Sequence, residues 1–382
     1  MSLSVQPVRT QRDWSDFFGL RRAIYKDDAA FVYPLRSMER LMIDSKKHPF
    51  FQHAEFQAFN CYRGKTLVGR IAAIQDHLHN DYYQDRLGFF GFFECMDDSD
   101  AARCLMDSAG NWLRDHGCDR VRGPVNPSMK EEFGILIEGF GIPPMVMMSY
   151  SRPYYDRLVT EYGFVKVMDF YAYLFDRNNA NQKQTFHNQE DALADAAQKI
   201  LARYPELEVR DCKKSEIGDM LGEINQLANV VRDDEWGFVP LTDAELEYMI
   251  QHVRRVIRPD MFLTVYWSGR LVGYCVNIPD VNTALHRTWG KSDWVRIPQF
   301  LYQLRRIDRT RVVAVGVDPE FRSRGAAPLL SIEMRRRGFA DPSLGKWEFS
   351  WIAENNMKSI RNMQRTIPVR KYKVYRLYEK SL

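Results

Sequence analysis

The residues best suited to bind an anionic substrate lie between positions 311 and 338, in RVVAVGVDPEFRSRGAAPLLSIEMRRRG. A β-branched run at 312–317 predicts a strand that ends before Asp318-Pro319. A turn and then an amphipathic helix follow it. The N-terminus of a helix presents unpaired N–H groups and partial positive charge, so it can hold a phosphate. Small residues at 325–327 would let a phosphate reach the backbone, and Arg322 and Arg324 add positive charge.

This segment resembles motif A of the GNAT superfamily of acyl-CoA-dependent N-acyltransferases. The motif, Arg/Gln-x-x-Gly-x-Gly/Ala, is met by Arg322, Gly325 and Ala327. An ordinary strand-turn-helix connection with a glycine turn is the alternative interpretation. The resemblance implies acetyl-CoA or a longer acyl-CoA as co-substrate, with the Val317 N–H facing the thioester carbonyl. The residues that it implies for binding CoA are Val315, Val317, Arg322, Ser323, Arg324, Gly325, Ala326, Ala327 and Asn356.

Acyl transfer to an amine requires a polarised thioester carbonyl, a neutral amine and a thiolate that leaves. For the general base we favour Glu235, which follows the first helix of the second half, where the family lines its acceptor site. Glu354 is a lesser candidate, and a surface carboxylate without a catalytic role is the alternative for both. Many GNAT enzymes carry a tyrosine that acts as general acid, about seven residues after the asparagine that Asn356 matches. The matching position here is Met363, and its first-half equivalent is Val159.

The chain repeats one plan of elements in its two halves. Hairpins are predicted at 56–72 and at 262–276, and both contain Leu-Val-Gly. The first half continues with a strand at 88–94, a helix at 100–116, a short helix at 154–162 and a strand at 165–175. The second half continues with a helix to about 338, a strand at 346–353, a helix from about 356 and a strand at 372–378. Gly316 within the strand at 312–317 indicates a close backbone approach or a relief of packing.

This order predicts an α/β fold (α+β, with a mixed sheet) of two tandem GNAT-like domains. We assign 1–178 to a degenerate domain that serves as scaffold or acceptor side, 179–205 to a linker and a helix, and 206–382 to the domain with the acyl-CoA loop. The Asn- and Gln-rich residues 176–189 are typical of a linker. In the first half, the turn at 94–100 lacks glycine and is strongly acidic, so it would repel a pyrophosphate. CoA binding is therefore assigned to the second half.

Composition gives broad limits. The chain has 382 residues, 45% of them apolar, and no apolar run of the roughly 20 residues that a membrane helix needs. It shows no signal peptide, and its six cysteines are scattered, which favours reduced thiols and a cytoplasmic location. The net charge is +4, and residues 181–382 carry 32 Lys or Arg against 26 Asp or Glu. His77 and His79 lack a third ligand set, so no metal site is expected.

Nearly the whole chain resembles a bacterial tandem-GNAT family, through GFFGFFE, RGPVNPS and Tyr171 with Tyr173. Some relatives are linked to N-acylation of long-chain amino-alcohol bases, the step that forms ceramide. The resemblance implies an acyl-CoA-dependent N-acyltransferase with a small or lipid amine as acceptor. A non-catalytic acyl-CoA-binding module and a tRNA-dependent aminoacyl transferase are the alternatives. The expected partners are acyl-CoA and an amine, without nucleic acid, and with peripheral membrane contact if the acceptor is a lipid.

Overall fold

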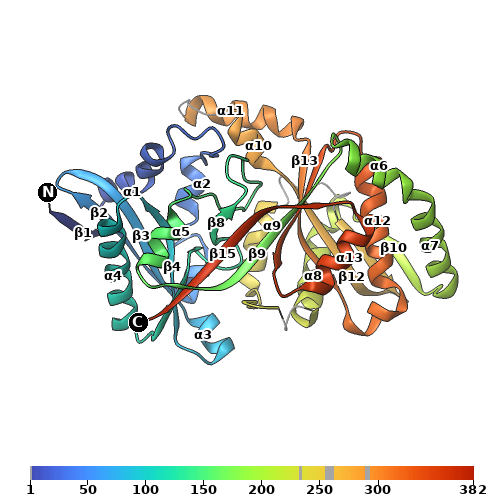
Figure 1. Cartoon of the computed structure of the whole chain (residues 1–382). Coiled ribbons are helices and arrows are strands. Elements are labelled where there is room, and N and C mark those ends of the chain that lie inside the picture. Colours follow the sequence, from blue (N-terminus) through green and yellow to red (C-terminus); the bar gives the residue numbers. More distant parts are fainter. Residues whose placement is uncertain (1, 232–234, 254–261, 289–292) are drawn as a thin grey trace. The chain divides into compact units, whose positions relative to one another are not determined.

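The computed structural model describes all residues except 1, 232–234, 254–261 and 289–292. The chain forms two compact units (Figure 1). Unit 1 contains Met1–Asp169, Thr288–Arg296 and Lys373–Leu382, and unit 2 contains Phe170–Arg287 and Ile297–Tyr372. The last ten residues therefore belong to the unit that is built mostly from the first half of the sequence. The division of labour between a scaffold half and a cofactor half stays a prediction.

Unit 1 is built on a sheet with the strand order β1-β2-β3-β4-β5-β15. All neighbours in it are antiparallel except β4 and β5, which are parallel. A separate pair, β6 and β7, lies off the sheet, and β8 pairs with β15. The strands are β1 (Leu3–Pro7), β2 (Ala54–Arg63), β3 (Thr66–Asp76), β4 (Leu87–Cys95), β5 (Arg120–Gly123), β6 (Val125–Asn126), β7 (Glu132–Phe133), β8 (Ile135–Glu138) and β15 (Arg370–Ser381). The helices are α1 (Gln11–Ile24), α2 (Arg36–Leu41), α3 (His77–Tyr83), α4 (Ser99–Asp115) and α5 (Tyr155–Glu161).

Helix α4 supplies much of the core of unit 1. Its buried residues Ala101, Leu105, Ala109 and Leu113 recur every four positions, so they form one apolar stripe that packs on β2 and β3. Every residue of β4 is buried, as expected for a strand with elements on both faces. The phenylalanines of β4 are core residues.

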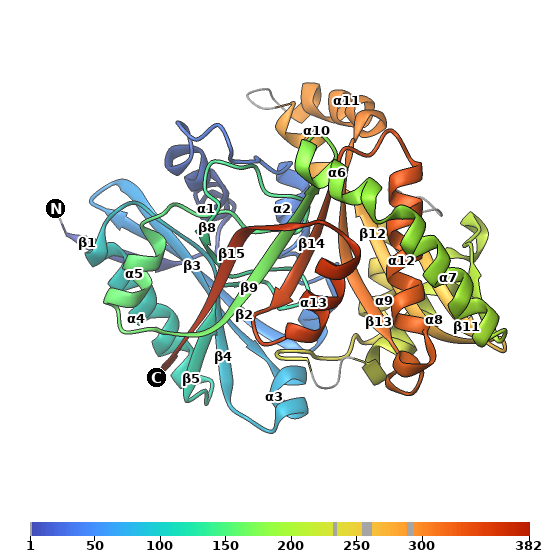
Figure 2. The same cartoon turned by 45° about the vertical axis from the view of Figure 1, so that its right-hand side comes forward.

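Unit 2 repeats the plan with the strand order β9-β14-β13-β12-β11-β10, in which only β13 and β14 are parallel (Figure 2). Helices α7, α12 and α13 share one core with one face of this sheet. The strands are β9 (Val165–Asp176), β10 (Leu207–Arg210), β11 (Phe262–Trp267), β12 (Arg270–Pro279), β13 (Arg309–Val317) and β14 (Lys346–Ala353). The helices are α6 (Ala180–Asn188), α7 (Glu190–Arg203), α8 (Ile217–Val231), α9 (Asp243–Val253), α10 (Val281–His286), α12 (Ala326–Ala340) and α13 (Met357–Thr366). Helix α11 (Asp293–Gln303) begins in unit 1 and continues in unit 2.

The predicted α/β fold, both hairpins and the strand at 346–353 are confirmed. The linker interpretation of residues 176–189 is wrong, because α6 occupies most of this segment. Asn179 caps α6, Phe186 is buried against Phe175 and Phe339, and the Gln182 amide donates to two backbone carbonyls. The asparagines and glutamines here cap and anchor a packed helix.

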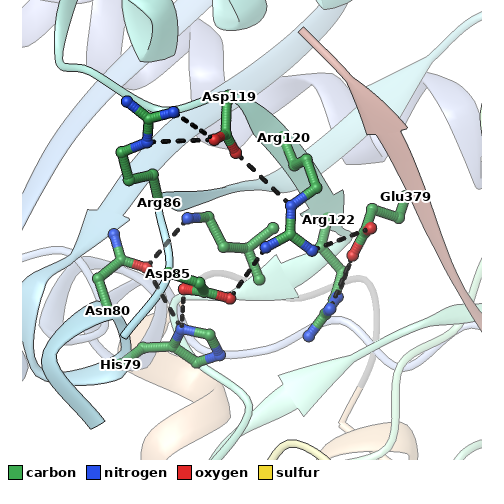
Figure 3. A network of polar contacts seen from close by, with 9 residues as sticks. His79, Asn80, Asp85, Arg86, Asp119, Arg120, Arg122 and Glu379 are labelled. Atoms are coloured by element: carbon green, nitrogen blue, oxygen red, sulfur yellow. Dashed lines mark hydrogen bonds and ion pairs between the residues drawn. The ribbon is translucent and has the colours of Figure 1, made fainter. Parts of the chain in front are cut away.

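The end of β15 is held in unit 1 by ion pairs (Figure 3). Glu379 accepts from the Nε and NH2 atoms of Arg122 at 2.9 and 2.7 Å and lies 3.4 Å from Arg120. Both partners of the closer pair are largely buried, with 17% and 14% of the side-chain surface exposed. Strand β15 also continues the sheet, pairing Tyr378 with Gly123. The C-terminal strand is thus an integral part of unit 1.

We expect Glu379→Ala to destabilise unit 1 by about 1–3 kcal/mol, because it removes the carboxylate oxygen that accepts two hydrogen bonds from the largely buried Arg122 guanidinium. The measurement is the urea midpoint, followed by circular dichroism, together with amide hydrogen exchange of β5. Glu161→Ala is the matched control, since Glu161 pairs with Arg157 at an exposed site and such pairs contribute about 0–1 kcal/mol. Equal midpoints for the two variants would contradict this account of β15.

Candidate active site

The predicted phosphate-binding loop is a short 3₁₀ turn that leads directly into α12. Pro319–Arg324 forms the turn, and Gly325 follows with φ of +86° in the left-handed region, which glycine adopts without strain. No side chain caps the N-terminus of α12. Ala326 is buried and Ala327 half-buried, so the first N–H groups of the helix are screened only by small side chains. This is the arrangement that anion binding requires.

Gly325 is required for a second reason. A Cβ atom there would lie 2.7 Å from Cγ2 of Ile200, on α7. Helix α7 therefore covers one side of the loop, and any larger residue at 325 would displace it.

Two exposed arginines flank the loop. The Arg322 Nε donates to the Val317 carbonyl at 3.0 Å, which ties this side chain to the end of β13. The Arg324 guanidinium lies 3.4 Å from Glu320 and 5.3 Å above the Phe321 ring. Ser323 between them is exposed. Both guanidinium groups therefore stand at the surface of the loop, where they can meet a phosphate.

Strands β13 and β14 separate beside this loop. Their parallel ladder runs from Arg309 opposite Lys346 to Val312 opposite Phe349, and no further pair is formed between the described residues beyond that point. Both strands continue, to Val317 and Ala353. We call these diverging ends, 313–317 and 350–353, the splay. The two ends form no ladder pair with each other, although the Val317 and Ser350 carbonyls accept from Arg322 and Arg311.

Val315 lies in the splay and has an exposed apolar side chain. It stands opposite Cys275, which packs in the core beneath α12, so Val315 points to the same face of the sheet. Its side chain is nevertheless 45% exposed. Burial raises the pKa of the neighbouring Cys275 thiol to about 12, so this thiol stays protonated and is a poor nucleophile. The contact of Val315 with the cofactor stays a prediction.

Gly316 has a packing role. A Cβ atom at 316 would lie 2.5 Å from the Tyr274 ring, so only glycine fits beneath that ring. The interpretation that Gly316 relieves packing is therefore confirmed. Val317 is buried, and the role of its N–H toward a thioester stays a prediction.

A buried polar cluster lies where the splay begins, and sequence reasoning missed it. Arg311 and Glu348 face each other on the ladder at 3.5 Å, and both are almost completely buried. The Ser350 hydroxyl donates to Glu348 at 2.5 Å and accepts from Arg311 Nε at 2.8 Å. The Tyr372 hydroxyl also donates to Glu348. The available signal was an arginine and a glutamate in otherwise apolar strands, since charged residues are buried only when paired.

The two candidate general bases lie near the same end of β14. Glu354 directly follows the strand and is half-buried. Glu235 precedes Trp236, whose ring lies 5.8 Å from Phe170, and Phe170 pairs with Ala353. Asn356 caps α13 by accepting from the Ser359 N–H at 3.2 Å. Glu354 and Asn356 thus follow the exit of β14, while Glu235 is placed only through its neighbour Trp236, and the roles of all three stay predictions.

The position of the usual catalytic tyrosine is filled by core residues in both units. Met363 packs in the core of unit 2, and Val159 is fully buried in the core of unit 1. A side chain at either position would be held away from solvent. Neither residue can protonate a leaving thiolate.

Unit 1 has the same parallel strand pair but closes its own splay. The β4–β5 ladder ends at Phe89 opposite Arg122, and β6 then lies against β4. The Asn126 side-chain oxygen accepts from the Phe92 N–H at 2.5 Å. A Cβ atom on Gly91 would lie only 1.7 Å from the Val125 carbonyl oxygen. The chain itself occupies the edge that β13 leaves open in unit 2.

Glu94 fills the position in unit 1 that Gly316 holds in unit 2. Glu94 stands opposite Arg70 on the ladder, as Gly316 stands opposite Tyr274. Its carboxylate accepts from Arg21 at 2.6 Å, Tyr155 at 2.7 Å and Tyr25 at 2.9 Å. Burial raises the pKa of both tyrosines, so their hydroxyls stay protonated as donors.

The helix that follows β4 is also closed to an anion. Asp98 caps α4 by accepting from the Ala101 N–H at 3.1 Å, and Arg63 pairs with the same carboxylate at 2.6 Å. A phosphate would have to displace this aspartate, which supports the assignment of CoA to unit 2.

His77 and His79 take separate partners. His77 lies 3.1 Å from Glu55, while His79 lies 3.7 Å from Asp85 in the network of Figure 3. Burial lowers the pKa of His79, which favours its neutral form. Among the described residues, no group of three or more His, Cys, Asp or Glu is arranged to hold a metal ion. All six cysteines are free thiols.

Comparison with known proteins supplies the family. No family model matches the chain. The chain is 30% identical, over a 389-residue alignment, to the bacterial ceramide synthase of Caulobacter vibrioides, covering 100% of this chain and 98% of that protein. It is 28% identical over 383 residues to protein YghO of Escherichia coli K12, with 99% and 95% covered. A solved tandem GNAT protein from the clavulanic acid biosynthesis pathway, without acetyl-CoA, aligns with a TM-score of 0.54 at 11% identity, over 100% of this chain and 98% of that one.

The solved structure shows that the fold is that of a tandem GNAT protein, as the loop motif and the repeated plan predicted. The identity to the ceramide synthase extends along both chains, so it includes both units and not a shared motif alone. The chain therefore belongs to the family of the bacterial ceramide synthase, N-acyltransferases built on the tandem GNAT fold.

Proposed function

We propose that this chain transfers the acyl group of an acyl-CoA to the primary amine of a long-chain amino alcohol. The observation that carries the proposal is the open splay of β13 and β14 beside the uncapped N-terminus of α12. Together they offer a strand edge for pantetheine and an anion site for the pyrophosphate. The acceptor class is taken from the ceramide synthase relative.

The reaction requires little of the protein beyond positioning the thioester and the amine. The amine must lose a proton before it attacks, because an alkyl ammonium has a pKa near 10. Glu235 or Glu354 would accept that proton at the exit of β14. The leaving thiol has a pKa near 8.5, so its departure as thiolate needs only modest assistance. With Met363 at the usual tyrosine position, water would return the proton to that thiolate.

The test is release of free thiol from acetyl-CoA and palmitoyl-CoA, each with polyamines, amino acids and sphingoid bases. We expect release that depends on the sphingoid base and is faster with the longer acyl chain. Release with a polyamine instead would support the acyltransferase activity but show that the acceptor is not a lipid amine.

A non-catalytic acyl-CoA-binding module is the second candidate, favoured by the burial of Met363 and Val159 where a tyrosine would act. It predicts CoA binding in calorimetry without thiol release for any amine. The same assay therefore separates the two functions.

Glu235→Gln is expected to lower kcat by roughly 10²-fold at pH 7, the usual contribution of a general base. The loss should shrink toward pH 10, where the amine is increasingly neutral without help. Glu354→Gln tests the lesser candidate and should reduce kcat less. The pH profile of kcat for both variants is the measurement, and wild-type kcat in both would remove these carboxylates from the mechanism.

A further inference from the structure

Helix α11, drawn in orange in Figure 2, exposes several large apolar side chains. Trp294 is 90% exposed, Leu301 57% and Tyr302 53%, and Val295 and Ile297 are also exposed. Positions 294, 297, 301 and 302 follow helical spacing, so these side chains form one continuous stripe. Single exposed apolar residues are common, but a contiguous stripe that includes a tryptophan indicates an interaction surface.

The opposite side of α11 carries the polar groups. Arg296 is buried, and its guanidinium donates to the backbone carbonyls of Tyr33 at 2.5 Å and Pro34 at 3.1 Å. Gln299 and Gln303 on this side are half-buried. A surface helix normally buries its apolar stripe and exposes its polar face. On α11 most of the apolar side chains are exposed instead, and the Arg296 contacts hold its first turn.

Exposed arginines gather at the C-terminal end of α11. Arg305 and Arg306 follow the helix, and Arg306 lies 4.8 Å above the Tyr302 ring. Arg287 is exposed as well and donates to the Gln303 side chain and the Arg306 carbonyl, both at 3.3 Å. Among the exposed described residues at 294–307, Arg305 and Arg306 are basic and none is acidic. An apolar stripe with a tryptophan, a tyrosine and arginines is thus joined to a local excess of positive charge.

We propose that α11 docks the chain onto the surface of an anionic phospholipid bilayer, with Trp294, Leu301 and Tyr302 in the headgroup region. The arginines would pair with the lipid phosphates. Tryptophan and tyrosine suit this region because an apolar ring carries a polar atom. An amphipathic helix that binds through apolar residues and basic charge lies in the plane of the interface.

Other features of the helix favour a bilayer surface. Among the described residues, no helix is long and apolar enough to cross a membrane, and α11 has 11 residues, so contact with a bilayer would be superficial. A second copy of the chain fits the surface less well, because it would bring the same arginines against one another. The inference rests on α11 and not on the proposed function.

The experiment is sedimentation of the full chain with vesicles of phosphatidylglycerol and phosphatidylethanolamine, and with phosphatidylcholine vesicles as the neutral comparison. We expect binding to the anionic vesicles, at least tenfold weaker binding to the neutral ones, and a decline with added salt. Trp294→Glu/Leu301→Glu should bind the anionic vesicles at least tenfold more weakly. Arg305→Glu/Arg306→Glu should do the same without a change in the apolar stripe.

Val230→Glu is the matched control, since Val230 is an isolated exposed residue at the end of α8. Wild-type binding by the Trp294/Leu301 variant, or equal binding to both vesicle types, would overturn the proposal. So would a wild-type dimer that the variant dissociates while neither binds vesicles, because the occupant would then be a second copy. Thiol release with a short-chain sphingoid base and no vesicles should be unchanged in the α11 variants, so a failure of docking and a failure of the acyltransferase are distinguishable.

Discussion

Arg324→Glu is expected to weaken acyl-CoA binding by roughly 10²-fold. A charge-assisted hydrogen bond between a guanidinium and a phosphate contributes about 1.5–3 kcal/mol, and each 1.4 kcal/mol is a factor of ten in affinity. Reversal of the charge also places a carboxylate beside Glu320, at the N-terminus where α12 should receive the pyrophosphate. Calorimetric titration with CoA measures the effect.

The sharper readout compares CoA with a thioester of pantetheine, which lacks the phosphates. The wild type should prefer the CoA thioester strongly, whereas Arg324→Glu should lose most of that preference. Arg336→Glu is the matched control, because Arg336 lies on the same helix, is exposed and also pairs with a glutamate. Normal CoA affinity in Arg324→Glu would show that the phosphates bind elsewhere.

The elements of this fold could be predicted because each has a local signal. Strand β14 was predicted at its observed bounds, since an apolar run ends at a clear turn sequence. Residues 176–189 were misinterpreted, because their composition is polar and their partners are distant in sequence. Phe186 stacks on Phe339 at 4.1 Å, and Arg335 donates to the Phe186 carbonyl. Contacts between residues so far apart in the sequence produce no recognisable sequence pattern within 176–189.

Parts of the candidate site that are contiguous in the sequence could be predicted, and parts that come from distant segments could not. The loop at 322–327 is contiguous, so its residue types alone indicate an anion site. The cluster of Arg311, Glu348 and Tyr372 comes from three strands, and only the sheet brings it together. The closure of unit 1 by Asn126 is also non-local. For α11, the apolar stripe is visible in the sequence, but the pattern does not reveal which way the stripe faces.

Val315→Trp should abolish acyl transfer, with a fall in kcat/KM of at least roughly 10²-fold that corresponds to about 3 kcal/mol of lost transition-state stabilisation. Val315 is exposed within the splay, so the indole would occupy the space between 313–317 and 350–353 that pantetheine needs. The fold should tolerate the change because the side chain is not packed in the core. Unlike Arg324→Glu, this variant should fail equally with the CoA and the pantetheine thioester.

Val230→Trp adds the same ring at an exposed position of unit 2 outside the splay, and it should keep full activity. Amide hydrogen exchange of β13 in Val315→Trp should match the wild type, which would separate a blocked site from an unfolded one. Arg324→Glu and Val315→Trp test the binding of two different parts of the cofactor, the phosphates and the pantetheine arm. If Arg324→Glu matches the wild type with the pantetheine thioester and Val315→Trp does not, the loop binds the phosphates and the splay binds the pantetheine arm. If Val315→Trp turns over normally, the open strand edge of unit 2 is not where acyl transfer occurs.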